Sequence, residues 1–116
     1  MTDIEFYRTS SGRCPVEDFL DDLTGKQTQK VTWVLQLISE LDQVPAQYWK
    51  KLSHTDDLWE ARVTFGRESF RLLGFFAETD RIVFTNGFQK KSQKTPRSEI
   101  QVADRRKKAY EHRSTQ

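Results

Sequence analysis

The sequence predicts an α+β domain: a small, mostly antiparallel sheet with two early helices on one face and a final helix at the C-terminal end. Three strand-like segments follow one another at short intervals between residues 58 and 88. Short connections between strands imply antiparallel neighbours. Two earlier segments carry apolar residues at helical spacing. The predicted element order is β-α-α-β-β-β-α, in one domain spanning residues 1–116.

The first half of the chain predicts one strand and two helices. Polar and apolar residues alternate in Asp3–Thr9, which predicts a short strand. Pro15 suits the first turn of a helix because its missing N–H costs nothing there, and Thr24–Gly25 should end that helix. The second helix is predicted over Gln27–Asp42. Residues 46–57 are predicted as a loop, which leaves room for a short strand near Trp49–Leu52.

The second half predicts a meander and a closing helix. The strand-like segments are Leu58–Phe65, Ser69–Ala77 and Arg81–Phe88. Thr95 should serve as the N-cap of the last helix, with Pro96 as its first residue. If the two early helices cover one face of the sheet, the other face remains free for a ligand.

Alternation along the strands assigns side chains to the two faces. In the first strand Glu60 and Arg62 should stand on the open face, opposite the apolar set Trp59, Ala61, Val63 and Phe65. In the second strand, one side holds Phe70, Leu72 and Phe76, and the other holds Arg71, Leu73 and Phe75. In the third strand, one side should hold Ile82, Phe84, Asn86 and Phe88.

Arg71 and the uneven charge distribution point to an anionic ligand. Residues 1–60 carry six Lys or Arg and eleven Asp or Glu, whereas residues 61–116 carry thirteen and six. A basic half can bind nucleic acid, although both halves could also be ordinary solvated surface. Arg71 lies between apolar neighbours and needs an anionic partner. Glu60, a phosphate group, or both in turn could supply it.

Several chemistries lack their motifs. Neither GxxxxGK[ST] nor GxGxxG occurs, and no His/Cys cluster has zinc spacing, so we expect no cofactor and no metal. Cys14 precedes a helix and is expected to pack or cap rather than react. We also expect no membrane span and a cytoplasmic location. What remains is metal-free chemistry on RNA, whose 2′-OH is its own nucleophile. The base could be a lysine of lowered pKa, Glu60 or His54.

Two segments resemble a known family. LWEARVTFGRESFRLLGFF, from residue 58, and IVFTNGFQKKSQKTPRSEIQVADRRKKAY, from residue 82, are similar to the RelE/HigB-type toxins of bacterial toxin–antitoxin systems, and nearest to their phage-associated HigB-like branch. The resemblance implies a RelE-like fold and ribosome-dependent, metal-independent cleavage of translated mRNA. It also implies a neighbouring antitoxin, often a helix-turn-helix protein of the HigA-like class, as partner.

Carried over by position, the resemblance implies a catalytic set of Glu60, Arg62, Arg71 and Lys91, with Glu60 as the orienting carboxylate. The predicted RNA contacts are Lys90, Lys94, Lys51, His54 and Arg97. Some relatives place a His or Tyr after the last strand, but NGFQKKSQK contains neither, so the general acid and base stay unassigned. Two alternatives remain open: a non-catalytic RNA- or ribosome-binding module, and a degenerate toxin that acts only as the antitoxin's partner.

Overall fold

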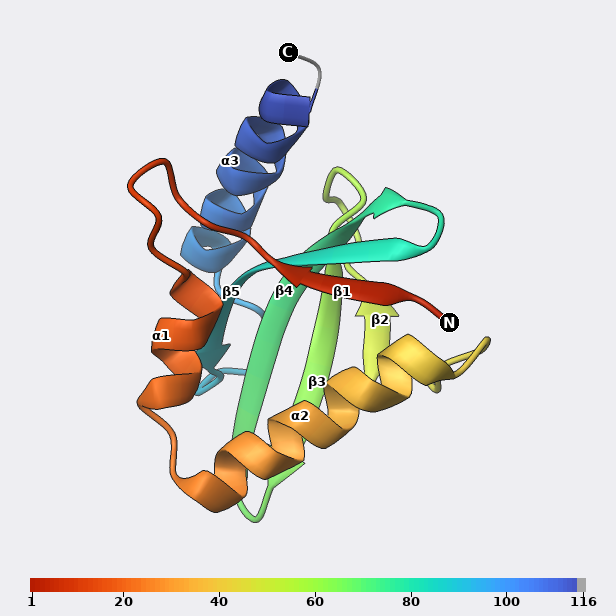
Figure 1. The fold of residues 1–116 in the computed structure, drawn as a ribbon. Coiled ribbons are helices and arrows are strands. Elements are labelled where there is room, and N and C mark those ends of the chain that lie inside the picture. The colour runs from red at the N-terminus through yellow and green to blue at the C-terminus, as the bar shows by residue number, and fades with distance from the viewer. Residues whose placement is uncertain (115–116) are drawn as a thin grey trace.

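Five strands form one mixed sheet in the computed structural model, which describes residues 1–114. The strand order is β1-β5-β4-β3-β2, with β1 parallel to β5 and the other pairs antiparallel (Figure 1). The bounds are β1 Asp3–Phe6, β2 Trp49–Lys51, β3 Trp59–Phe65, β4 Glu68–Glu78 and β5 Arg81–Gln89. The α+β class is confirmed. The element order agrees with the prediction except for one additional strand, β2, which lies where the sequence allowed a short strand near Trp49–Leu52.

Three helices flank this sheet: α1 Pro15–Asp21, α2 Gly25–Glu40 and α3 Arg97–Ser114. Helix α2 begins at Gly25, earlier than predicted, because Thr24 and Gln27 form a capping box. The Gln27 N–H donates to Thr24 Oγ1 at 3.2 Å, and the Thr24 N–H donates to Gln27 Oε1 at 2.9 Å. Cys14 precedes α1 without a side-chain capping bond and is buried, so it packs, as expected.

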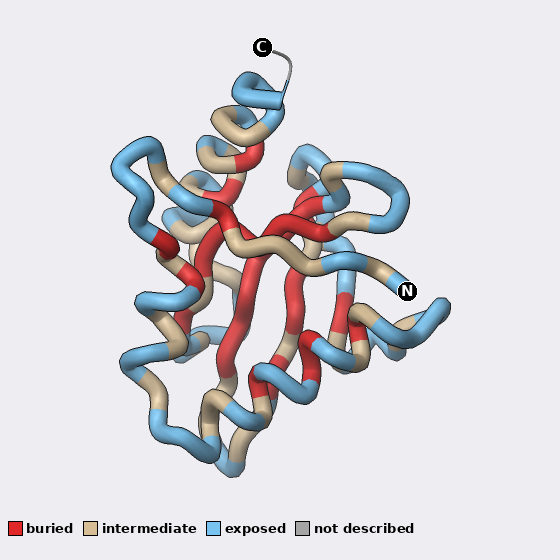
Figure 2. Tube along the Cα trace, in the orientation of Figure 1, coloured by how far each residue is buried: buried red, intermediate tan, exposed pale blue. Residues whose placement is uncertain are grey.

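The main core lies between the sheet and helices α1 and α2. Helix α2 crosses β3 and β4 in Figure 1, and long stretches of both strands are buried in Figure 2. The predicted side assignment of β3 and β4 is confirmed here. This core contains Val16, Val31, Val34, Leu35, Ile38, Trp49, Ala61, Val63, Phe70, Leu72, Ile82 and Phe84.

The second face of the sheet is partly covered, so the expectation of a wholly free face is wrong. Helix α3 returns across it and packs Ala103 and Ile100 against a second apolar cluster. This cluster contains Leu73, Phe75, Val83 and Phe88 of the sheet, together with Leu58, which immediately precedes β3. A helix with an apolar stripe must bury that stripe, and the second face is where α3 does so. This packing leaves uncovered the end of the face that carries Arg62.

A β-bulge in β5 overturns the predicted alternation there. Leu73 pairs with Asn86 but Gly74 pairs with Phe84, so Thr85 is an extra residue. Phe84 therefore faces the main core, whereas Phe88 joins the second cluster. The bulge also turns Asn86 toward α3, where its Nδ2 donates to Glu99 Oε1 at 2.9 Å.

No helix among the described residues is both long enough and apolar enough to cross a membrane.

Candidate active site

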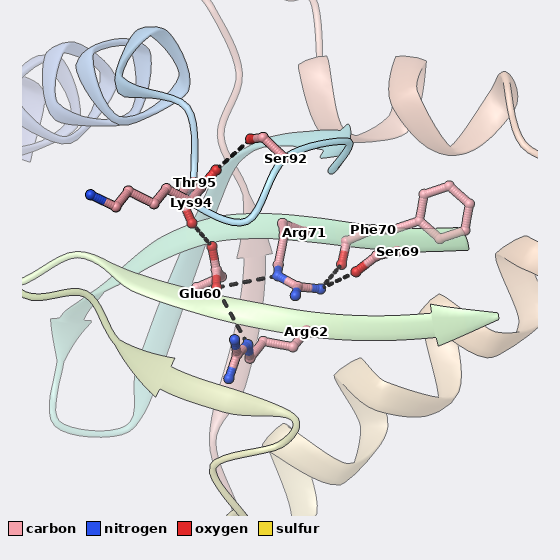
Figure 3. A network of polar contacts seen from close by, with 8 residues as sticks. All are labelled: Glu60, Arg62, Ser69, Phe70, Arg71, Ser92, Lys94 and Thr95. Atoms are coloured by element: carbon pink, nitrogen blue, oxygen red, sulfur yellow. Dashed lines mark hydrogen bonds and ion pairs between the residues drawn. The ribbon is translucent and has the colours of Figure 1, made fainter. Parts of the chain in front are cut away.

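The candidate site lies on the second face, at the end of β3 and β4 that α3 does not cover (Figure 3). Arg62 on β3 and Arg71 on β4 are directly paired in the strand register, and Glu60 precedes Arg62 by two residues. Residues two apart on a strand share a face, so all three side chains project from the same side of the sheet. Their meeting depends on the antiparallel pairing of β3 with β4.

Glu60 is the anionic centre of this group. Only 3% of the residue is exposed, and its Oε1 lies 3.3 Å from Arg71 Nε and 3.5 Å from Arg62 Nε. Its other oxygen, Oε2, accepts a hydrogen bond from the Thr95 hydroxyl. A buried carboxylate is tolerated only when paired and hydrogen-bonded, and Glu60 meets both conditions. The predicted Glu60–Arg71 ion pair is present.

Arg71 is a buried cation with hydrogen-bonding capacity to spare. It is 8% exposed, and its Nη1 donates to Ser69 Oγ at 2.7 Å and to the Phe70 carbonyl at 3.0 Å. Its Nε faces Glu60 as an ion pair but makes no hydrogen bond among the described residues. Burial lowers the pKa of Arg71, and the Glu60 carboxylate partly offsets this. Arginine stays protonated in proteins, so Arg71 remains a cation that shares the Glu60 carboxylate with Arg62.

Lys90 lies at the edge of the same site. It is half-buried at the end of β5, and its N–H donates to the Ser69 carbonyl at 2.7 Å. Burial and then the charge of Arg71 lower the pKa of the Lys90 ammonium, while Glu60 acts in the opposite direction. Lys91, which the resemblance placed in the catalytic set, is exposed on the following segment. Lys90, which the sequence analysis predicted only as an RNA contact, is therefore the lysine whose pKa depends on Arg71 and Glu60.

The other residues that the sequence analysis predicted as RNA contacts do not gather at this site. Lys94 is exposed next to Thr95 and points away from the Glu60–Arg71 pair in Figure 3. Arg97 is exposed at the first position of α3. Lys51 pairs in register with Trp59, which places it on the α2 face, and its Nζ lies 2.8 Å from Asp57 Oδ1. The structure therefore does not bring Lys51 to the site.

His54 also lies elsewhere. It occupies the loop between β2 and β3 with a φ of 60°, and it lines a cavity of about 290 Å³ beside Asp104 and Lys108 of α3. Within residues 1–114, His54 forms no hydrogen bond or ion pair with Glu60, Arg62 or Arg71. This location supports a lysine rather than His54 as the candidate base.

Two residues of the site escaped the sequence prediction. Lys50 pairs in register with Glu60, so it is Lys50, not Lys51, that shares the face of the arginines. Its alternation with the buried Trp49 was the available signal. Thr95 was expected to cap α3, but the helix begins at Arg97 and the Thr95 hydroxyl donates to Glu60 instead. That expectation is corrected.

Chemically, this arrangement can bind a phosphate and balance its charge. Arg62 and Arg71 share the single carboxylate of Glu60, and Lys90 lies at the edge of the site, so the site keeps a net positive charge. The hydrogen-bond and ion-pair partners of these residues include neither His nor Tyr in the described part of the chain. Within residues 1–114, no group of three or more His, Cys, Asp or Glu side chains could hold a metal ion.

No curated protein matches the chain. A protein family does match, over residues 18–108, and it is described as phage derived protein Gp49-like (DUF891). The match spans well over half of the chain and includes Glu60, Arg62, Arg71 and Lys90. The chain therefore belongs to the Gp49-like family of phage-derived proteins, a RelE/HigB-like toxin family of toxin–antitoxin systems.

Proposed function

We propose that this chain is the toxin of a toxin–antitoxin pair, nearest to the HigB-like toxins, and that it cleaves translated mRNA on the ribosome. One observation carries the proposal: Arg62 and Arg71, which are paired in register on β3 and β4, share the single carboxylate of Glu60. Two guanidinium groups with one carboxylate between them leave a net positive charge. A phosphate group of bound RNA would balance that charge.

The cleavage step would use this site, the 2′-hydroxyl of the RNA and a proton for the leaving oxygen. The 2′-oxygen forms a bond to phosphorus, the bond from phosphorus to the 5′-oxygen breaks, and the products are a 2′,3′-cyclic phosphate and a 5′-hydroxyl. Arg62 and Arg71 would balance the charge that develops on the phosphoryl oxygens, which is the largest contribution in many such sites. Glu60 would hold both guanidinium groups in place.

Proton transfer would fall to the lysines that end β5. A lysine can act as a base only when its pKa is lowered toward the working pH. Lys90 meets this condition in direction, because burial and the charge of Arg71 both lower its pKa. Lys91 is the catalytic lysine implied by the resemblance. The leaving 5′-oxygen would recover a proton from solvent or from the other lysine.

The same proposal implies which molecules the chain would bind. Lys50, Lys94 and Arg97 are exposed and would contact the phosphates of mRNA or ribosomal RNA. The cognate antitoxin, which the resemblance makes a helix-turn-helix protein of the HigA-like class, would neutralise the toxin. The cytoplasm would be the location, because translated mRNA is the substrate.

Induced expression tests the proposal. The wild-type chain should arrest growth, and primer extension on a translated message should reveal new 5′ ends that are missing from an untranslated copy. Arg71→Ala should relieve the arrest and remove the cuts. If Arg62→Ala, Arg71→Ala and Lys91→Ala all remain fully toxic, the assigned site is wrong.

A second candidate function is a non-catalytic RNA- or ribosome-binding module on the same surface. The observation in its favour is the lack of a His or Tyr partner among the described contacts of the site. This module would bind RNA with a steep salt dependence, because phosphate contacts release counterions, but it would leave the message intact. Binding without new 5′ ends, with no growth arrest, would favour it. Loss of binding as well would favour a degenerate toxin that serves only as the antitoxin's partner.

A further inference from the structure

The segment that carries the three lysines is fastened to the sheet at two points. At its start, the Lys90 N–H donates to the Ser69 carbonyl at 2.7 Å. At its end, the Thr95 hydroxyl donates to Glu60 Oε2 (Figure 3). Between these points, the Ser92 hydroxyl donates to the Lys94 carbonyl at 2.8 Å, which is a bond within the segment. Thr95 is therefore the side chain that ties the far end of the lysine segment to the strands.

We infer that Thr95 is a positioning residue that joins the lysine segment to the arginine pair through Glu60. The inference rests on the proposed function, since it names how the parts of that site are held together. The two oxygens of Glu60 have different partners: Oε1 pairs with Arg62 and Arg71, and Oε2 accepts the hydrogen bond from Thr95. One carboxylate thus sets the relative position of cations that come from β3, β4 and the segment after β5.

The backbone around Thr95 reinforces this role. Pro96 follows it, and a proline disfavours the helical conformation for the residue before it. The Pro96 carbonyl accepts from the N–H groups of Glu99 at 3.1 Å and Ile100 at 3.2 Å, so the first turn of α3 starts immediately beyond Thr95. Thr95 is consequently the junction between a rigid helix and the lysine segment, and its hydroxyl fixes that junction to the buried Glu60.

The Thr95 contact also assigns a role to Glu60. A carboxylate that already faces two arginines with one oxygen and accepts from a hydroxyl with the other has little capacity left to take a proton from RNA. Glu60 should therefore act as an anchor for the arginines, and proton removal should fall to a lysine. Removing the Thr95 hydroxyl would leave Oε2 buried without a donor and free Glu60 to rotate, which would displace the guanidinium groups.

Three variants test this inference. Thr95→Val removes the hydroxyl and keeps the shape, Thr95→Ser keeps the hydroxyl, and Thr32→Val makes the same chemical change at an exposed position on α2. Cleavage of translated mRNA by purified protein on programmed ribosomes should fall about tenfold or more in Thr95→Val, because small misplacements of reacting groups are costly in rate. The loss should appear in kcat rather than in KM. Thr95→Ser should retain most of the activity, and Thr32→Val all of it.

Hydrogen–deuterium exchange gives a readout that does not depend on cleavage. In Thr95→Val the amides of residues 91–95 should exchange faster than in the wild-type chain. In Thr95→Ser these amides should exchange about as slowly as in the wild-type chain. If the wild-type chain fails to cleave but shows this exchange pattern, the proposed function fails and the positioning role stands. Two results would overturn the positioning role. One is that Thr95→Val cleaves RNA and exchanges its amides at the same rates as the wild-type chain. The other is that Thr95→Val and Thr95→Ser lose cleavage activity to the same extent.

Discussion

The two densest groups of cations in this chain are satisfied in different ways. On α3, each of three successive cations has its own oxygen: Arg106 Nη1 donates to the Thr85 carbonyl at 2.9 Å, Lys107 Nζ to the Asp56 carbonyl, and Lys108 Nζ lies 2.9 Å from Asp104 Oδ2. On the sheet, Arg62 and Arg71 share the carboxylate of Glu60. Lys90 makes no ion pair within the described residues.

This difference shows that a run of positive charge does not by itself identify a binding site. The α3 run looks the more basic in the sequence, yet its side chains point in several directions around the helix and hold the fold together. The sheet cations are fewer, but they lie on one face, and Arg62 and Arg71 share one carboxylate. Cations that lack a carboxylate of their own, rather than the number of charges, should therefore mark the functional surface.

The largest expected effect is at Arg71. Arg71→Ala should lower mRNA cleavage by about 100-fold or more, a loss typical of removing a donor that stabilises developing charge. Arg71→Lys should recover only part of it, because lysine keeps the charge but lacks the guanidinium fork. Primer extension and growth after induction measure both variants. Arg106→Ala is the matched control and should cleave normally; equal losses in Arg71→Ala and Arg106→Ala would remove the contrast between the two groups.

The pH dependence of cleavage should separate Lys90 from Lys91. A base acts in its neutral form, so the rate should rise with pH while the base is mostly protonated and level off above its pKa. Because the pKa of Lys90 lies below the ordinary 10.5, the rise should end earlier than for a solvated lysine. Lys90→Ala should abolish this rise and lower the rate by about tenfold or more.

The matched control is Lys91→Ala, measured over the same pH range on the same ribosomes. If Lys91→Ala removes the rise and Lys90→Ala leaves it intact, Lys91 is the base, as the family resemblance implied. If both single variants keep the rise, no lysine of this pair removes the proton.

How far the sequence could predict this site depends on which physical signal each residue leaves. Alternation in β3 and β4 was strong enough to place Arg62 and Arg71 on one face and to pair Arg71 with Glu60. The Thr85 bulge left no such signal, because one inserted residue reverses every later side chain of a strand without changing its composition.

The remaining misses have local causes. Lys50 and Lys51 are adjacent, so a single step of register decides which of them faces Glu60. A threonine before a proline is an ordinary helix cap, and only the tertiary position of Glu60 turned the Thr95 hydroxyl away from α3. The start of α2 at Gly25 could have been predicted, since Thr24 followed three residues later by Gln27 is a capping-box pattern.

Lys107 should matter for stability and not for cleavage. It is 6% exposed, and its ammonium contacts the Asp56 carbonyl and lies 3.6 Å from Asp56 Oδ2. Lys107→Ala should lower the free energy of unfolding by about 1–3 kcal/mol, because it opens a buried site and leaves a carbonyl without its donor. Urea denaturation measures this change. Normal stability combined with lost cleavage would place Lys107 in the functional surface and contradict the division drawn between the two groups.

The smallest expected effect concerns exposed lysines around the site. Lys94→Ala should weaken RNA binding only a few-fold, and it should reduce the slope of log K against log salt by about one, the change expected when one phosphate contact is lost. Lys50→Ala should behave in the same way if its register position beside Glu60 brings it to the RNA. Lys108→Ala is the control, because Asp104 already pairs with that ammonium. Salt titrations with a short single-stranded RNA measure all three slopes. An unchanged slope for Lys94→Ala together with a reduced slope for Lys108→Ala would move the RNA path from the open end of the sheet to α3.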